Sequence, residues 1–161
     1  MNSLVVFYSR TGRTRKIGEI ISTEANWDIE EIIDTKKRTG FIGFLKSGKD
    51  ATLKKLTDIR DVQKNPEIYD LIILGTPIWN KRMTPAIRTY ITKFKDIIKN
   101  VAFFCTEGGS GGKKTFESMA NLCEKTPIST LEITKKDIKN GEYKDKIKIF
   151  IQDLKSDSIF D

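Results

Sequence analysis

A hydroxyl-rich segment near the N-terminus has the residue types that bind a phosphate group. It consists of Ser9, Arg10, Thr11, Gly12, Arg13 and Thr14. Hydroxyl groups can donate to phosphate oxygens, Gly12 allows a sharp turn, and the first amides of a following helix favour an anion. The spacing matches neither the loop of nucleoside triphosphatases nor that of dinucleotide folds, so it suits one terminal phosphomonoester. The alternative is a hydroxyl-rich helix start without a ligand, and the two arginines can face solvent or pair with the phosphate.

The composition limits the chemistry that the rest of the chain can supply. The 161 residues include no histidine, which excludes Ser-His-Asp catalysis, Cys-His catalysis and histidine metal sites. Any chemistry must therefore come from a cofactor or from other side chains, and we expect no metal site and no catalytic residue. Cys105 and Cys123 are too few for a disulfide scaffold and are expected in the core. The N-terminal apolar run is too short for a signal peptide or a membrane span, so we expect a soluble, cytoplasmic protein.

Three apolar runs indicate the buried strands that must position the hydroxyl-rich segment. They are Leu4–Tyr8, Leu71–Leu74 and Val101–Cys105. Because none alternates polar and apolar residues, each suits a strand covered on both faces, as in a parallel sheet. Two weaker strands are expected at Trp27–Ile33 and Pro127–Thr134, the second at a sheet edge because it starts with proline.

Apolar residues at helical spacing fill the gaps between these strands. Helices are expected around Ile17–Ile21, Ile87–Phe94, Phe116–Cys123 and Tyr143–Leu154. Thr84 followed by Pro85 is typical of a helix start. Strands that alternate with helices predict an α/β fold, a doubly wound five-stranded parallel sheet between two helical layers. We expect a single domain over residues 1–161, with a frayed tail at residues 156–161.

Two segments resemble motifs of the flavodoxin family. Residues 9–14 resemble its [ST]-x-T-G-x-T phosphate loop and follow the first strand, as in that family. Tyr-Asp at 69–70, the apolar run and Gly-Thr-Pro-Ile-Trp at 75–79 resemble its second loop. The resemblance covers roughly residues 3–155 and fits the short-chain type, because the last strand leads into the final helix without a long insertion. It implies a flavodoxin-like strand order, 2-1-3-4-5, in a three-layer α/β/α arrangement that binds FMN at the carboxyl ends of the strands.

The resemblance also implies which residues hold the cofactor. The expected cofactor-binding residues are Ser9, Arg10, Thr11, Gly12, Arg13, Thr14, Thr76, Pro77, Ile78, Trp79, Asn80, Thr106, Glu107, Gly108, Gly109 and Gly112. Trp79 offers a flat surface for the isoalloxazine ring, although a tryptophan that closes the core from the rim fits the same pattern. Asn80 stands where many members have glycine, and the Trp79–Asn80 peptide is expected to change orientation with the flavin's oxidation state. Glu107 either shifts the flavin potential by its charge or is solvated. The glycine-rich third loop lacks the tyrosine of many members, so it leaves the ring open to a second reactant.

The connection between the second and third strands is long and basic. Between Asp34 and Lys64 nine residues are basic and four are acidic, which accounts for most of the net charge of +7. Within it, a short helix is expected at Asp50–Leu56. Phe41 and Phe44 are expected either to cover the flavin rim or contact a partner, or to pin this connection to the sheet edge.

Three functions are compatible with these features. The favoured one is an FMN-binding electron carrier between redox partner proteins, with acidic partners favoured by the positive charge. The alternative is an FMN-dependent oxidoreductase of flavodoxin fold, of the quinone reductase or protoporphyrinogen dehydrogenase type, with NAD(P)H or a quinone as reactant. The basic connection and the missing tyrosine favour this second function. A nucleic-acid-binding module is disfavoured because basic and aromatic residues do not alternate. The oligomeric state is left open.

Overall fold

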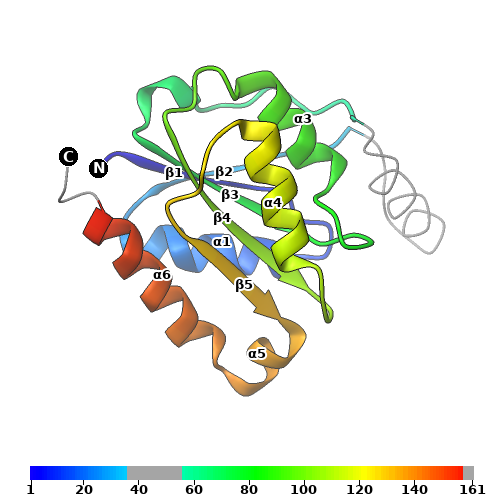
Figure 1. Cartoon of the computed structure of the whole chain (residues 1–161), viewed down its shortest axis with the longest axis vertical. Helices are drawn as coiled ribbons and strands as arrows, with labels where there is room; N and C mark the ends of the chain where they lie inside the picture. The colour runs from blue at the N-terminus through cyan, green and yellow to red at the C-terminus, as the bar shows by residue number, and fades with distance from the viewer. Residues whose placement is uncertain (36–55, 158–161) are drawn as a thin grey trace.

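A five-stranded parallel sheet forms the centre of the computed structural model, which describes residues 1–35 and 56–157 (Figure 1). The strands are β1 (Ser3–Phe7), β2 (Asp28–Glu31), β3 (Leu71–Pro77), β4 (Asn100–Glu107) and β5 (Thr130–Thr134). Their order in space is β2-β1-β3-β4-β5, and all neighbours pair in parallel. The expected doubly wound fold and strand order are therefore confirmed, and β5 lies at an edge as expected.

Helices cover both faces of the sheet (Figure 1). Their bounds are α1 (Arg13–Ala25), α3 (Pro85–Phe94), α4 (Gly112–Cys123), α5 (Lys135–Asn140) and α6 (Tyr143–Asp157). Alternate residues of β1 enter two separate cores, Leu4 and Val6 beneath α3 and α4, and Val5 and Phe7 beneath α1 and α6. This two-sided burial explains why the strand sequences are continuously apolar.

Two central strands are longer than the apolar runs predict. The β3–β4 ladder continues through Thr76 paired with Cys105 and Pro77 paired with Thr106, and β4 ends only at Glu107. Several expected loop residues of the site therefore belong to strand ends, where backbone pairing fixes their positions. A one-turn 3-10 helix, η1 (Pro66–Ile68), precedes β3.

The two cysteines lie in the core, as expected. Cys105 and Cys123 are both buried and both free thiols. Burial raises the pKa of the Cys123 thiol to about 12, so neither the location nor the protonation state suggests reactivity.

The short helix α5 is absent from the expected elements. Its first turn is closed by a capping box: the Asp137 amide donates to Thr134 Oγ1 at 3.1 Å, and the Thr134 amide donates to Asp137 Oδ2 at 2.7 Å. The sequence carried this signal as a threonine followed three residues later by an aspartate, with Gly141 after the helix. The last strand thus reaches the final helix through α5, which brings Lys135 to the carboxyl end of the sheet.

The chain end also differs from expectation. Ser156 and Asp157 were expected in a frayed tail but belong to α6. Phe41, Phe44 and all but the last residue of the expected helix at Asp50–Leu56 lie outside the described residues, so these expectations stay predictions. In the described ranges, no helix is long and apolar enough to cross a membrane.

Replacing Asp137 with Asn is expected to make the protein less stable at neutral pH and less sensitive to acid. Burial alone would raise the pKa of Asp137, but hydrogen bonds from Lys146 and Thr134 outweigh burial and lower it to about 2. A carboxylate with a lowered native pKa contributes stability above its unfolded pKa, and this contribution is lost as pH falls toward 2. We expect Asp137→Asn to lower the free energy of unfolding by about 1–2 kcal/mol at pH 7.

Urea unfolding at pH 7 and pH 3 measures this loss of stability, with substitution of the exposed Asp96 by Asn as the control. An equal loss at both pH values would contradict the assignment.

Candidate functional site

The segment between β1 and α1 folds into a tight phosphate-loop geometry. Gly12 has φ of 87°, in the left-handed region that favours glycine, and it immediately precedes the first residue of α1. The Gly12 amide donates to Ser9 Oγ at 3.1 Å, which closes the turn. The start of α1 has no acidic residue in its first turn, so its free amides and positive dipole end are available to an anion.

Thr14 connects this loop to the centre of the sheet. Its side chain is buried, and its hydroxyl lies 2.8 Å from the hydroxyl of Thr106 near the end of β4. Each threonine hydroxyl carries one proton and two acceptor lone pairs. If Thr106 donates its proton to Thr14, the proton of Thr14 remains available to a ligand at the helix start. The sequence alone did not show this contact across 92 residues.

The three predicted loops meet around one cavity of about 320 Å³ at the carboxyl end of the sheet. The predicted residues that line it are Arg10, Thr11, Arg13, Thr14, Pro77, Ile78, Trp79, Thr106, Glu107 and Gly108. Lys135 at the start of α5 also lines the cavity and was missed, because the helix that positions it was not expected.

The other predicted site residues lie beside the cavity rather than on its wall. They are Ser9, Gly12, Thr76, Asn80, Gly109 and Gly112. Ser9 and Gly12 shape the phosphate loop through the hydrogen bond between them. Thr76 is fully buried and accepts from the Thr84 amide at 3.1 Å, so it holds the start of α3. Thr84 is the N-cap residue of α3, as expected, but its hydroxyl makes no capping hydrogen bond.

Trp79 is positioned by a two-residue hairpin turn. Its amide donates to the Arg82 carbonyl at 3.0 Å, and the Arg82 amide donates back at 3.1 Å. The two central residues, Asn80 and Lys81, have φ of 49° and 58°. Positive φ at both central positions is the type I′ geometry, which asparagine tolerates well. The positive φ expected at Asn80 is therefore present, while the change of orientation with oxidation state stays a prediction.

The indole of Trp79 is 8% exposed and packed on two sides. Tyr8 meets it edge-on at 5.6 Å between ring centroids, and the Arg10 guanidinium carbon lies 5.7 Å from the ring centroid. A flat ligand can stack on the face near Arg10 only if that side chain rotates away. Arginine has enough rotamer freedom to do so.

Glu107 places a buried carboxyl group on the cavity wall. It is 3% exposed, and its Oε2 has no hydrogen-bond partner in the described part of the chain. Burial raises its pKa to about 7, helped by the nearby Glu132 carboxyl, while a hydrogen bond from the Gly112 amide acts in the opposite direction. The sequence left Glu107 either solvated or shifting the flavin potential by its charge. The structure buries its side chain, and its effect on the flavin stays a prediction.

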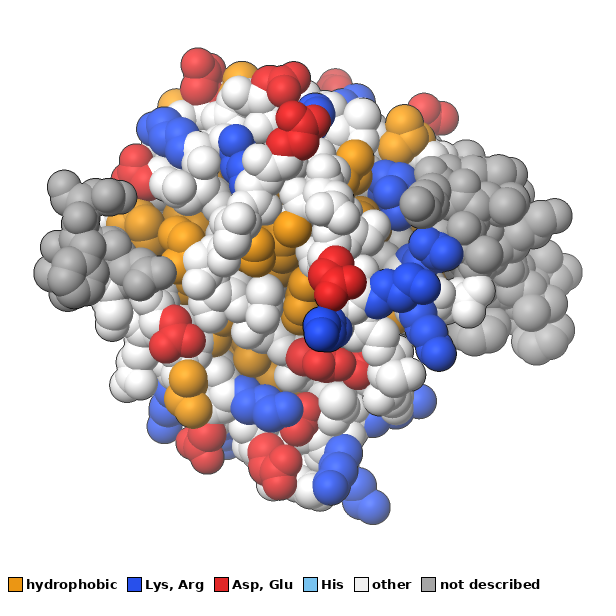
Figure 2. Space-filling model, viewed as in Figure 1, with side chains coloured by type: hydrophobic (Ala, Val, Ile, Leu, Met, Phe, Trp, Pro, Cys, Tyr) orange, Lys and Arg blue, Asp and Glu red, His pale blue; other side chains and the backbone are white. Residues whose placement is uncertain are grey.

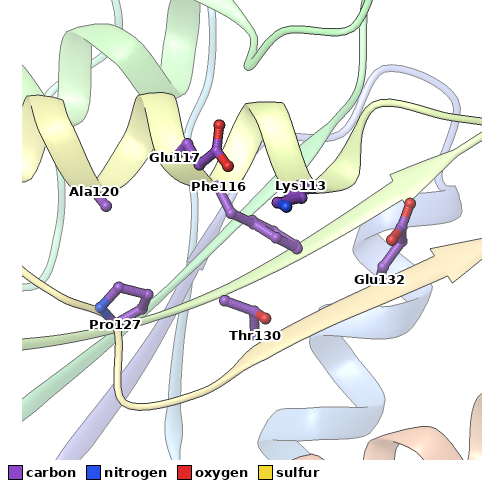
Figure 3. Close-up of a pocket in the computed structure, with 7 residues that line it drawn as sticks. All are labelled: Lys113, Phe116, Glu117, Ala120, Pro127, Thr130 and Glu132. Atoms are coloured by element: carbon purple, nitrogen blue, oxygen red, sulfur yellow. The ribbon is translucent and has the colours of Figure 1, made fainter.

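The partner carboxyl, Glu132, comes from the edge strand. Figure 3 shows it rising from β5 at one end of a groove between α4 and β5, which Lys113 and Phe116 also line. A Cβ atom at Gly112 would lie 2.5 Å from the carboxyl carbon of Glu132, so a larger residue there would displace this carboxyl from the start of α4. Gly112 therefore supports the site by packing rather than by lining the cavity.

The chain is similar to known flavoproteins in sequence pattern and in fold. A family model described as flavodoxin matches residues 2–154. No curated protein sequence matches the chain. A flavoprotein of Lactobacillus acidophilus NCFM in complex with FMN has a TM-score of 0.72 at 20% identity, over 89% of this chain and 98% of that one. General stress protein 14 of Treponema denticola, also in complex with FMN, has a TM-score of 0.56 at 12% identity, over 97% of this chain and 99% of that one.

A third solved structure, the two-electron reduced flavodoxin of Megasphaera elsdenii, has a TM-score of 0.52 at 18% identity, over 81% of this chain and 85% of that one. At these identities the structural likeness shows the fold alone. The family model, in contrast, spans nearly the whole chain. The chain belongs to the flavodoxin family.

Proposed function

We propose that the chain binds FMN in the cavity at the carboxyl end of the sheet and transfers electrons between redox partners. The observation that carries the proposal is the phosphate-loop geometry, in which a left-handed Gly12 opens the amides of α1 next to the buried hydroxyl of Thr14. Solved flavoproteins of the same fold, from Lactobacillus acidophilus and Treponema denticola, are complexes with FMN.

The residues around the cavity fit both ends of FMN. The helix start with Thr11 and Thr14 suits the phosphate, and Arg10, Arg13 and Lys135 add positive charge around the same cavity. The aromatic surface of Trp79 and the apolar wall of Pro77 and Ile78 suit the flat ring.

Glu107 provides a further sign of a ligand. Its buried Oε2 can accept a hydrogen bond that no residue in the described ranges supplies, and the imide N–H of a flavin ring is a donor of the required kind. When bound, FMN supplies the one- and two-electron chemistry, and the protein supplies binding, orientation and electrostatics.

Fluorescence of the two tryptophans provides a direct test of FMN binding at Trp79. Trp79 lines the cavity, whereas Trp27 precedes β2 at the opposite end of the sheet. We expect FMN to quench the fluorescence of the wild type and of Trp27→Phe, and to quench Trp79→Phe much less. We also expect Trp79→Phe to bind FMN about 3- to 10-fold more weakly, because a smaller ring offers less stacking. A folded wild type that shows no quenching and no yellow colour with added FMN would refute the proposal.

An oxidoreductase is the second candidate, and one observation favours it. Gly108, Gly109 and Ser110 are exposed and carry no aromatic side chain, so the third loop leaves room for a reactant. Steady-state oxidation of NAD(P)H with a quinone distinguishes the two functions. Turnover that saturates with both substrates supports the enzyme. Reduction by a redox protein with negligible NAD(P)H oxidation supports the carrier.

A further inference from the structure

A second cavity, of about 520 Å³, lies between α3 and α4 on the side of the hairpin away from the proposed FMN site. The residues that line it are Lys81, Arg82, Arg88, Lys114, Glu117, Ser118, Asn121 and Leu122. Four of these side chains are cationic and only one is a carboxylate. Figure 2 shows Lys and Arg side chains gathered on this face beside α4 and the turn after β3.

Arg88 is the unusual member of this group. It belongs to the first turn of α3, is 7% exposed, and its Nε and Nη2 atoms are both buried with no hydrogen-bond partner within residues 1–35 and 56–157. These two atoms form the edge of the guanidinium that donates hydrogen bonds to two oxygens of one anion. Arg15 makes such a bidentate contact in the same protein: its Nε and Nη2 donate to the two carboxylate oxygens of Glu31 at 2.8 and 2.9 Å.

Burying the Nε and Nη2 atoms of Arg88 without hydrogen-bond acceptors is unfavourable for the folded protein. Burial, and then repulsion by Arg82, lowers the pKa of Arg88, which shows that the surroundings oppose its charge. A leucine or methionine on this face of α3 would pack without that cost, because a buried charge without a partner destabilises a protein far more than an apolar side chain does. A buried arginine beside three further cations is therefore explained by a ligand, not by packing.

We propose that this cavity binds a small ligand through an oxyanion group, a phosphate or a carboxylate, which Arg88 holds with its two-donor edge. Lys81, Arg82 and Lys114 attract and neutralise the same group. The cavity volume suits a small molecule. This site is separate from the phosphate loop, since none of the residues that line one cavity lines the other.

The hairpin after β3 joins the two sites. Trp79 lines the proposed FMN cavity, while Lys81 and Arg82 of the same turn line the anion cavity. The turn also packs against the start of α4, where a Cβ atom at Gly111 would lie 3.0 Å from Lys81 Cα. An anionic ligand would therefore bind one turn away from the proposed electron-transfer centre.

Anion binding can be tested independently of FMN by measuring the melting temperature and the binding isotherm of the full chain with pyrophosphate and with citrate. Ionic strength is held constant with sodium chloride, because screening alone changes stability. We expect both anions to bind, and Arg88→Leu to weaken binding by about 10- to 100-fold through loss of a charge-assisted bidentate contact. The conservative Arg88→Lys should weaken binding by about 10-fold, because an ammonium lacks the planar two-donor edge.

Two control variants separate this site from the phosphate loop and from net charge. Thr14→Val alters the phosphate loop, and Lys99→Leu removes one charge at the opposite end of β4, so both should retain anion binding at the α3–α4 cavity. In buffer without a binding anion, Arg88→Leu should melt at the same or a higher temperature than the wild type. Anion binding that Thr14→Val abolishes and Arg88→Leu retains would overturn the proposal. So would an Arg88→Leu variant that melts much lower, or a wild type that binds neither anion.

Discussion

Thr14→Val is expected to weaken FMN binding by about 10- to 100-fold while leaving the affinity for riboflavin nearly unchanged. Riboflavin has the same ring as FMN but no phosphate, so it reports on every contact except those of the phosphate loop. Thr14 is buried at the first turn of α1, and valine fills the same volume without the hydroxyl. A hydrogen bond to a charged group contributes about 1.5–3 kcal/mol, which corresponds to the expected loss of affinity. The measurement is a pair of fluorescence titrations for each protein.

Thr115→Val is the matched control for this substitution. Thr115 is a buried threonine of α4 whose hydroxyl has no hydrogen-bond partner among the residues that the structure describes. Its replacement should leave the affinities for both flavins unchanged and should leave stability unchanged or slightly raised. If Thr14→Val weakened riboflavin and FMN binding equally, the phosphate would not be bound at the start of α1.

The sequence predicted the parts of this fold and site that depend on local pattern. Continuous apolar runs identified the central strands because those strands are buried on both faces, and the hydroxyl-rich loop was recognisable because its chemistry is confined to six consecutive residues. Contacts between distant segments were not predictable. Thr14 and Thr106 are 92 residues apart, and nothing in either segment alone indicates that their hydroxyls meet.

The features of the site that were not predicted have equally specific causes. Lys135 was missed because α5 has only six residues and is too short to show an apolar period, although its capping box was visible in the sequence. Glu107 was predicted at the site, but its burial was not. Glu107 is buried because β4 continues two residues past its apolar run, and this places the charged residue inside the carboxyl end of the sheet.

The Glu107 carboxyl is surrounded by groups that favour its neutral form. Glu132 from β5 lies within hydrogen-bonding reach, and burial removes the water that would stabilise a charge. The opposing group is the Gly112 amide at the start of α4, whose hydrogen bond lowers the pKa. Because burial and the Glu132 carboxyl both oppose the charge of Glu107, its pKa is raised to about 7.

Glu107→Gln is expected to remove most of the pH dependence of stability between pH 5 and pH 8. The native pKa of Glu107, about 7, lies above its ordinary value of 4.5, so the protonated carboxyl stabilises the fold below pH 4.5 and this contribution is lost as pH rises through 7. A shift of this size corresponds to about 3 kcal/mol in total, of which about 2–3 kcal/mol is lost between pH 5 and pH 8. Glutamine mimics the neutral carboxyl, so the variant should match the wild type at pH 5 and exceed its free energy of unfolding by that amount at pH 8.

Urea unfolding of the FMN-free protein at pH 5, 6.5 and 8 measures this difference. The window is free of the usual competing titration, because the sequence contains no histidine. Glu132→Gln is the informative second variant. By removing the neighbouring carboxylate it should bring the pKa of Glu107 closer to its ordinary value, so that the fall in stability begins at a lower pH than in the wild type. A wild type whose stability is flat from pH 5 to pH 8 would show that Glu107 is already ionised at pH 5, and that the cavity stabilises its carboxylate rather than its neutral form.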